Sequence, residues 1–236
     1  MRATRSTIAA LGACAVLAGC SSAPVDDAPV VRIKEAAKPS VSRPLDQVLP
    51  TGDEMATILG TPGFMGQLVE GGPDMLLQGV RESEATPVEC VSAGYRLQKV
   101  AYQAGPVREV ASRPWAGGDQ NGPTHSGFFG AVKFATPDDA QAFFAASAGK
   151  WHRCNGQTLV LHQPEHGADG SSRITDVVVD TRVVSAVVLH DDGSTIQRAL
   201  GVASDCVVDI EITDAGGGAQ GAVQIADLML QKVGVS

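Results

Sequence analysis

The chain has 236 residues, a hydrophobic content of 44% and a formal net charge of −8 at pH 7. An acidic chain lacks the basic excess with which proteins bind nucleic acid or anionic membranes, so neither is an expected partner. Its length is enough for one domain with a full hydrophobic core, even after an N-terminal segment is set aside.

The N-terminus has the layout of a bacterial lipoprotein signal. Arg2 and Arg5 precede an apolar run over residues 8–18 that is too short to cross a bilayer. The run closes in Leu-Ala-Gly-Cys at Cys20, a sequence that looks like a lipobox, in which the cysteine is diacylglycerylated and the signal is cut just before it. We therefore expect residues 1–19 to be a signal peptide and Cys20 to carry lipid. Ordinary cleavage that leaves Cys20 as a plain thiol is the alternative.

The segment after this cysteine is rich in proline, serine and mixed charge and has no apolar periodicity. Residues 20–43 are therefore predicted to be the lipidated cysteine and a flexible tether, and residues 44–236 the folded domain. The expected location is the extracytoplasmic face of the cell membrane, with the lipid as the membrane contact.

The most strongly patterned stretch is a predicted helix that begins at Pro137. Thr136 can cap it, and proline suits the first helical position because its missing N–H would be unpaired there anyway. One apolar stripe recurs at three-to-four spacing, formed by Ala140, Phe143, Phe144 and Ser147. Gly149 is expected just beyond the helix end.

Other helices are predicted at the two ends of the domain. Residues 45–59 read as two short helices broken by Pro50 and Gly52, with Asp53 as the cap of the second. Residues 60–88 are expected to be loop with a helical turn, and a final helix is expected from about Gln220 to Lys232.

Strand-like runs occupy much of the remainder. Residues 107–113 alternate as an edge strand would, and residues 126–135 read as an inner strand that leads into the helix at Pro137. Five further runs follow Cys154, at residues 158–162, 174–180, 183–190, 196–202 and 206–213. Because the breaks between them are short and turn-like, an antiparallel meander is predicted.

In the last of these runs the side chains alternate in character. Cys206, Val208 and Ile210 are expected to face a core, while Asp209 and Glu211 are expected to face a partly wet surface. The inward position favours inert packing for Cys206 over a reactive or dimer-forming thiol.

No residue set indicates a catalytic or metal site. His125 and Ser126 are adjacent, but the serine begins a strand and no nucleophile-elbow motif is present. His152 lies near Cys154, and two further histidines, His162 and His166, are four residues apart, yet no third ligand follows at zinc-site spacing. We therefore predict no catalytic residue, no metal and no cofactor.

Several segments occur in an order that resembles the PknH-like extracellular sensor domain family, including its stand-alone lipoproteins. They are L-P-T-G-D-E-M-A-T-I-L-G, the C-x-x-A-G at Cys90, P-D-D-A-Q-A-F-F, the W-x-x-C at Trp151 and Cys154, Q-R-A-L before V-V-D-I, and I-A-D-L-M-L-Q-K-V. The resemblance covers roughly residues 45–234. It implies an α+β fold, a single domain whose central antiparallel sheet is flanked by helices, with a cleft for an unidentified ligand.

The resemblance also implies a disulfide between Cys90 and Cys154, and export to an oxidising compartment supports that pairing. Two buried thiols are the alternative. Many family members have a second bridge, but this chain has Ile196 at its first position and no cysteine after Cys206, so that bridge is absent.

The predicted function is binding or sensing of a cell-envelope ligand, which could be a small molecule, lipid, glycan or protein. Tyr102, Trp115 and Trp151 are the candidate ligand-binding residues, because binding pockets are mostly apolar with few polar anchors. Trp115 in particular is expected in a loop with no core role. The alternative is an envelope hydrolase whose site the sequence does not reveal.

Overall fold

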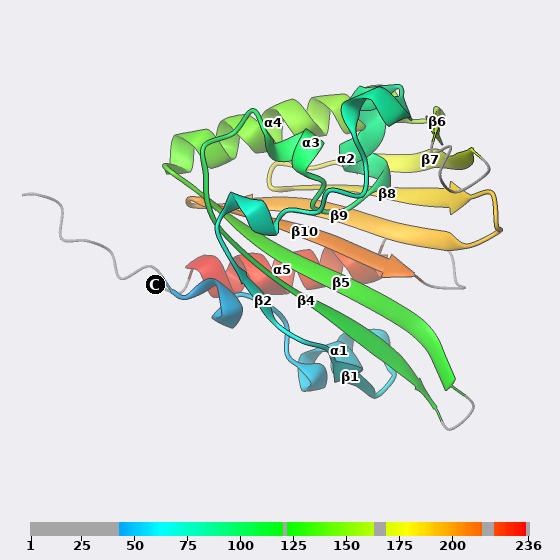
Figure 1. Cartoon of the computed structure of the whole chain (residues 1–236). Helices are drawn as coiled ribbons and strands as arrows, with labels where there is room; N and C mark the ends of the chain where they lie inside the picture. Colours follow the sequence, from blue (N-terminus) through cyan, green and yellow to red (C-terminus); the bar gives the residue numbers. More distant parts are fainter. Residues whose placement is uncertain (1–42, 120–121, 163–168, 214–219, 235–236) are drawn as a thin grey trace, which may run out of the picture. The chain divides into compact units, whose positions relative to one another are not determined.

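An antiparallel β-sheet is the centre of the fold (Figure 1). The computed structural model describes residues 43–119, 122–162, 169–213 and 220–234. In spatial order the strands are β1 (Gly63–Met65), β4 (Val107–Asp119), β5 (Gly122–Phe134), β10 (Cys206–Thr213), β9 (Thr195–Ala203), β8 (Val183–His190), β7 (Gly170–Val179), β6 (Thr158–Leu161) and β3 (Ala85–Thr86). The short β2 (Val69–Gly71) also pairs with β4.

The strands that follow residue 157 form the predicted meander. Each of β6 to β9 pairs antiparallel with the next strand, because the connections between β7 and β10 are too short for a parallel crossover. β10 then pairs with β5, which confirms the inner position expected for that strand. The edge position expected for residues 107–113 is wrong, because β1 and β2 from the predicted loop region cover the outer side of β4.

The helical elements pack on this sheet. They are η1 (Leu45–Gln47), α1 (Gly52–Leu59), η2 (Pro73–Met75), η3 (Glu82–Glu84), η4 (Val88–Cys90), α2 (Val91–Gly94), α3 (Lys99–Tyr102), α4 (Pro137–Cys154) and α5 (Gln220–Gly234). α4 starts as predicted: Thr136 Oγ1 accepts a hydrogen bond of 3.1 Å from the Asp139 N–H. The helix does not end before Gly149. Trp151 and Cys154 are both buried in its last turn, and their packing outweighs the penalty of about 1 kcal/mol for an interior glycine.

α1 is separated from η1 at Pro50, as predicted, but its cap is Thr51 and not Asp53. Thr51 Oγ1 accepts from the Glu54 N–H at 3.3 Å, and Glu54 Oε2 accepts from the Thr51 N–H at 2.7 Å. This reciprocal capping box satisfies two backbone donors at once. Asp53 therefore lies inside the first turn, where its charge favours the positive end of the helix dipole.

Hydrophobic cores lie on both faces of the sheet. One contains side chains of α2, α3 and α4, with Tyr102, Phe144 and Trp151 among its large members. The other contains side chains of α1 and α5, with Trp115 and Phe129 among its large members. In Figure 1, α4 and α5 lie on opposite sides of the strands. The fold is thus α+β, a single domain in which helices flank an antiparallel sheet, as predicted.

Cys90 and Cys154 form the predicted disulfide, with their Cα atoms 5.7 Å apart. The bond joins the end of η4 to the end of α4 and closes a loop of 64 residues. In the chain-entropy model such a loop stabilises the fold by about 3 to 5 kcal/mol. Cys206 is a free, buried thiol, in agreement with its predicted inward position.

Candidate functional site

A buried ion cluster occupies the α4 face of the sheet. Its centre is Arg198 on β9, whose side chain is 0% exposed. Arg198 Nη2 lies 2.8 Å from Asp209 Oδ1, and Nη1 lies 3.9 Å from Glu211 Oε2. The guanidinium also donates to three backbone carbonyls, those of Ser92, Ala93 and Ile210. A buried charge is tolerated only with such pairing and hydrogen bonding.

The same cluster holds the segment of residues 91–102, which contains α2 and α3, against the sheet. Asp209 Oδ2 accepts from the Leu97 N–H at 2.8 Å and from the Tyr102 hydroxyl at 2.9 Å. Burial, together with the Asp209 charge, raises the pKa of Tyr102 well above its ordinary value. Leu97 sits directly over Gly130, where a Cβ atom would lie only 2.6 Å from the leucine Cδ1. This glycine therefore allows the close approach of the segment.

The partly wet surface predicted for Asp209 and Glu211 is wrong, because both residues are buried. The helical segment 91–102 covers them, and Arg198 supplies their opposite charge. Among the sequence motifs, Arg198 belongs only to the Q-R-A-L segment of the family resemblance. The signal in the sequence is an arginine as the only charged residue of its strand. The next strand contains two acids, Asp209 and Glu211, at alternate positions.

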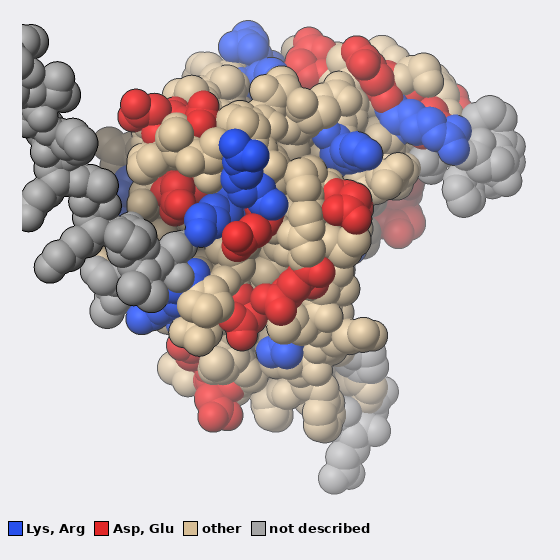
Figure 2. All heavy atoms as spheres, turned by 60° about the vertical axis from the view of Figure 1, so that its left-hand side comes forward, with Lys and Arg blue, Asp and Glu red and all other residues tan. Residues whose placement is uncertain are grey.

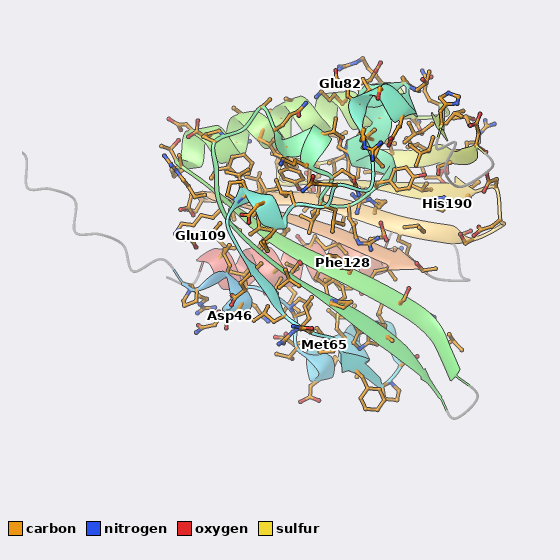
Figure 3. All side chains as sticks on the ribbon, viewed as in Figure 1. Asp46, Met65, Glu82, Glu109, Phe128 and His190 are labelled. Atoms are coloured by element: carbon orange, nitrogen blue, oxygen red, sulfur yellow. A yellow bond between two sulfur atoms is a disulfide. The ribbon has the colours of Figure 1, made fainter. Side chains whose placement is uncertain are left out.

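The ion cluster reaches the surface at Arg96. Arg96 Nη1 forms an ion pair with Glu211 Oε1, and the guanidinium carbon lies 4.2 Å from the centroid of the Phe128 ring. The Arg96 side chain stays 31% exposed. Figure 3 labels Phe128 on this part of β5. Neither Arg96 nor Phe128 was identified from the sequence, since their contact joins a helical connection to a distant strand.

A hollow of about 190 Å³ opens beside this pair. It is lined by Arg96, Pro114, Trp115, Ser126, Gly127, Phe128, Glu211 and Thr213. The residues come from the connection between α2 and α3 and from three neighbouring strands, β4, β5 and β10. The lining combines a half-exposed aromatic ring, a guanidinium and hydroxyl groups, which is the mixture of apolar surface and few polar anchors found in binding sites.

Strand register extends this surface in a row across the sheet. Phe64 pairs with Ala116, Ala116 with Ser126, Ser126 with Thr213, and Thr213 with Ile196. Partners in register share a face of the sheet. The residues of this row, together with those lining the hollow apart from Trp115 and Gly127, form what we call the sheet-face shelf: Phe64, Arg96, Pro114, Ala116, Ser126, Phe128, Ile196, Glu211 and Thr213.

The Phe64 side chain, at one end of the shelf, is 86% exposed. Its neighbour Met65 packs on the α5-side core with Trp115, to which it is paired. Because side chains alternate along a strand, Phe64 points to the opposite face, where the shelf lies.

A hydrogen-bonded chain of three side chains lies on the same face at β7 and β8. The Tyr95 hydroxyl is 2.9 Å from Ser172 Oγ, which is 2.9 Å from His190 Nδ1. Burial raises the pKa of Tyr95, and the charges of Asp191 and Glu211 raise it further. Ser172 is 0% exposed, so its hydroxyl is closed to a substrate. Among the described residues, no carboxylate hydrogen-bonds to His190, which lies at the end of β8 (Figure 3).

The three aromatic candidates from the sequence have buried side chains. Tyr102 stacks on Phe143 with ring centroids 4.6 Å apart, and Trp151 Nε1 donates to Ser92 Oγ at 3.1 Å. Trp115 is not in a loop, as expected, but in β4, where its ring belongs to the α5-side core. It also lines the hollow. The structure thus places only Trp115 of the three beside the shelf, at the hollow, and ligand binding by any of them stays a prediction.

The histidines considered from the sequence lie apart. His125 Nδ1 is 2.8 Å from Thr124 Oγ1, and His162 Nδ1 is 2.9 Å from Asp169 Oδ2. His166 lies outside the described residues. Over the described ranges, no group of three or more His, Cys, Asp and Glu side chains is placed to hold a metal ion.

Two further observations concern the surface and membranes. On the face drawn in Figure 2, acidic and basic side chains are interspersed, so this face offers no extended basic patch for nucleic acid. No helix in the described part of the chain combines the length and the apolar character needed to span a bilayer.

Comparisons with known proteins agree with this fold. The crystal structure of the extracellular domain of PknH from Mycobacterium tuberculosis has a TM-score of 0.72 at 23% identity, covering 84% of this chain and 99% of that one. This likeness shows a shared fold. An uncharacterized protein from Mycobacterium smegmatis has a TM-score of 0.39 at 10% identity, over 82% of this chain and 97% of that one, too low to carry an argument. The curated proteins contain no match.

The model of the PknH-like extracellular domain family matches residues 41–232. That range contains every strand of the sheet, the disulfide and the shelf. This protein is therefore a member of the PknH-like extracellular domain family.

Proposed function

We propose that this protein is a membrane-anchored extracytoplasmic lipoprotein that binds a cell-envelope ligand on the sheet-face shelf. The observation that carries the proposal is the pair of Arg96 and Phe128 beside the hollow of about 190 Å³. Elsewhere on the same face the strands are covered by α2, α3 and α4. The shelf is where an aromatic ring and a guanidinium remain within reach of a ligand.

Membership of the family supports an extracytoplasmic, sensor-like role. The solved relative is described as an extracellular domain of PknH. The N-terminal segment has the order of a lipoprotein signal, which supports lipid attachment at Cys20. A domain held at the membrane by lipid would meet envelope components directly.

Binding is favoured over hydrolysis by the geometry around His190. A serine nucleophile must be open to substrate and hydrogen-bonded to a base that a third group orients. Ser172 is close to His190 but fully buried, and its other partner is a tyrosine hydroxyl. The charged groups beneath the shelf are paired with one another and hold the 91–102 segment in place.

The test is to purify the full chain from a mycobacterial host in a detergent without sugar head groups and to identify copurifying molecules by mass spectrometry. We expect a reproducible species whose amount falls at least tenfold in Phe128→Ala and in Arg96→Ala. Matched controls are Phe143→Ala, another half-buried aromatic, and Arg153→Ala, an exposed arginine on α4. Equal amounts in the shelf variants and the wild type would contradict the proposal.

A further inference from the structure

We infer that the ligand of the sheet-face shelf is a neutral oligosaccharide that lies across the strands, with sugar rings on Phe128 and Phe64. This inference rests on the proposed function, because it specifies the chemistry of the same site. It is carried by three properties of the shelf: the position of its two phenylalanine rings, its balance of charge and the groups between the rings.

The two phenylalanines are placed to contact different parts of an extended molecule. Phe64 on β1 and Phe128 on β5 are separated by two strand spacings, and Phe128 lies two residues along β5 from the row that contains Phe64. With strands 4.7–4.9 Å apart and a rise of about 3.4 Å per residue, the two positions are about 12 Å apart. This separation exceeds the length of one sugar ring. The two phenylalanine rings would therefore contact non-adjacent sugar units of one oligosaccharide.

The shelf has no excess charge for an anionic ligand. Arg96 is paired with Glu211, and Arg198 beneath it is paired with Asp209. An anion that approached Arg96 would also meet the Glu211 carboxylate, which is a repulsive contact. Charge complementarity therefore favours a neutral ligand over a phosphate, a carboxylate or an anionic lipid head group.

The centre of the row is polar and open. Ser126 is exposed and Thr213 is half-buried, and each hydroxyl can both donate and accept hydrogen bonds. Arg96 Nη1 is bonded to Glu211 and the Arg96 side chain stays 31% exposed, so the guanidinium offers further N–H donors, although its Nε is buried. These hydroxyls and the guanidinium can hydrogen-bond to sugar hydroxyls. The C–H faces of the sugar rings can at the same time stack on the phenylalanine rings.

Other ligand classes fit less well. An acyl chain would bury the two hydroxyls without hydrogen bonds, which is unfavourable because each would lose its hydrogen bonds to water. A peptide that binds by strand addition needs a free sheet edge, whereas the shelf is the face of paired strands. An oligosaccharide uses both the rings and the hydroxyls.

The test uses linear α-glucan, α-mannan and arabinan oligosaccharides of one to six units. Each is titrated into the detergent-solubilised full chain by calorimetry, with saturation-transfer NMR as a second readout. Inorganic phosphate and phosphatidylglycerol vesicles serve as anionic probes. We expect one neutral series to bind with an affinity that rises with length up to about four units, while the anionic probes bind at least tenfold more weakly.

Variants distinguish the contributions of Phe128 and Phe64 to the binding affinity. Phe128→Ala should weaken binding about tenfold at every length, and Phe128→Leu, which keeps most of the packing volume, should do the same if the ring itself matters. Phe64→Ala should leave mono- and disaccharide affinity unchanged and remove the gain seen with longer chains. The control is Val178→Ala, an apolar residue 62% exposed on β7, with no expected effect.

The possible results distinguish this inference from the proposed function. Binding of phosphate or vesicles that depends on Phe128, without binding of any oligosaccharide, would overturn the inference and leave the shelf as the site. Oligosaccharide binding that is insensitive to Phe128, Arg96 and Phe64 would overturn the inference together with the shelf. A length-dependent gain that persists in Phe64→Ala would refute the placement across the strands.

Discussion

Arg198 carries a full positive charge in a position without solvent, and its surroundings explain how this is possible. Two carboxylates and three carbonyl groups contact the guanidinium, and the Trp151 ring lies 5.7 Å away. These partners come from β10, the 91–102 segment and α4, whereas Arg198 itself lies on β9. One side chain thus connects the sheet to the segment that borders the shelf.

Replacement of Arg198 by alanine is expected to destabilise the protein by about 3–5 kcal/mol, because Asp209 would remain buried without its ion-pair partner. The measurement is the free energy of unfolding from urea denaturation monitored by circular dichroism. The matched control is Arg173→Ala on β7, where the arginine is exposed and a change within about 0.5 kcal/mol is expected. Equal stability of the two variants would show that the cluster does not stabilise the fold.

Cys206 is expected to be chemically inert in the folded protein. Burial raises the pKa of its thiol to about 12, with a further contribution from the Asp205 charge, and the thiolate is the reactive species. Iodoacetamide at pH 8 should therefore leave the Cys206 peptide unmodified in the native chain and alkylate it completely in urea, as measured by peptide mass spectrometry. Alkylation in the native chain at the rate of an unfolded cysteine peptide would refute this prediction.

At the level of elements, a polar contact joins the first and last helices of the domain. Lys232 Nζ on α5 donates to Glu54 Oε2 on α1 at 2.6 Å and to the Leu49 carbonyl at 2.9 Å. Glu54 also belongs to the capping box of α1. One carboxylate therefore supports both the start of α1 and its attachment to α5.

This contact should make part of the stability depend on pH. Burial alone would raise the pKa of Glu54, but its bonds to Lys232 and Thr51 outweigh burial and lower it from the ordinary value of 4.5. A carboxyl whose pKa is lower in the folded state stabilises above its unfolded pKa, and the contribution disappears as the pH falls through the folded pKa. Glu54→Gln should cost about 1 kcal/mol at pH 7 and close to nothing well below pH 4.

Urea denaturation of both proteins across this pH range measures the difference. A double-mutant cycle with Lys232→Met provides the control, since Glu54→Gln should cost less when the lysine is already absent. A cost for Glu54→Gln that is the same at pH 7 and pH 3 would contradict the assigned role of the carboxylate.

At the scale of the whole molecule, the proposed lipid at Cys20 sets where the domain acts. Cys20→Ser should abolish retention in the membrane fraction after a high-salt wash, because two acyl chains anchor a protein stably whereas the acidic domain has no electrostatic attraction to the bilayer. Immunoblotting of the fractions is the measurement. Cys14→Ser, which changes the signal segment and leaves the lipobox intact, should be retained like the wild type. Retention of Cys20→Ser would exclude lipid as the anchor.

Local elements of this protein could be predicted from the sequence because they depend on residues close together in the chain. The cap and first turn of α4 involve positions within four residues, and the meander follows from alternation and short turns. Errors arose where packing overrode these local signals: Gly149 continues its helix because Trp151 and Cys154 are buried beyond it.

The candidate site depended on tertiary structure. Asp209 binds the Leu97 N–H across 112 positions of sequence, and Arg96 pairs with Glu211 across 115, so no periodicity in either segment could reveal the contact. The sequence alone determined α4, α5 and the strands of the meander and, through family resemblance, the disulfide, but not the short strands within residues 60–88. Only the fold decided that both faces of β10 are covered, and that strand register brings Phe64 and Phe128 onto one exposed surface, because register is set by pairing between distant segments.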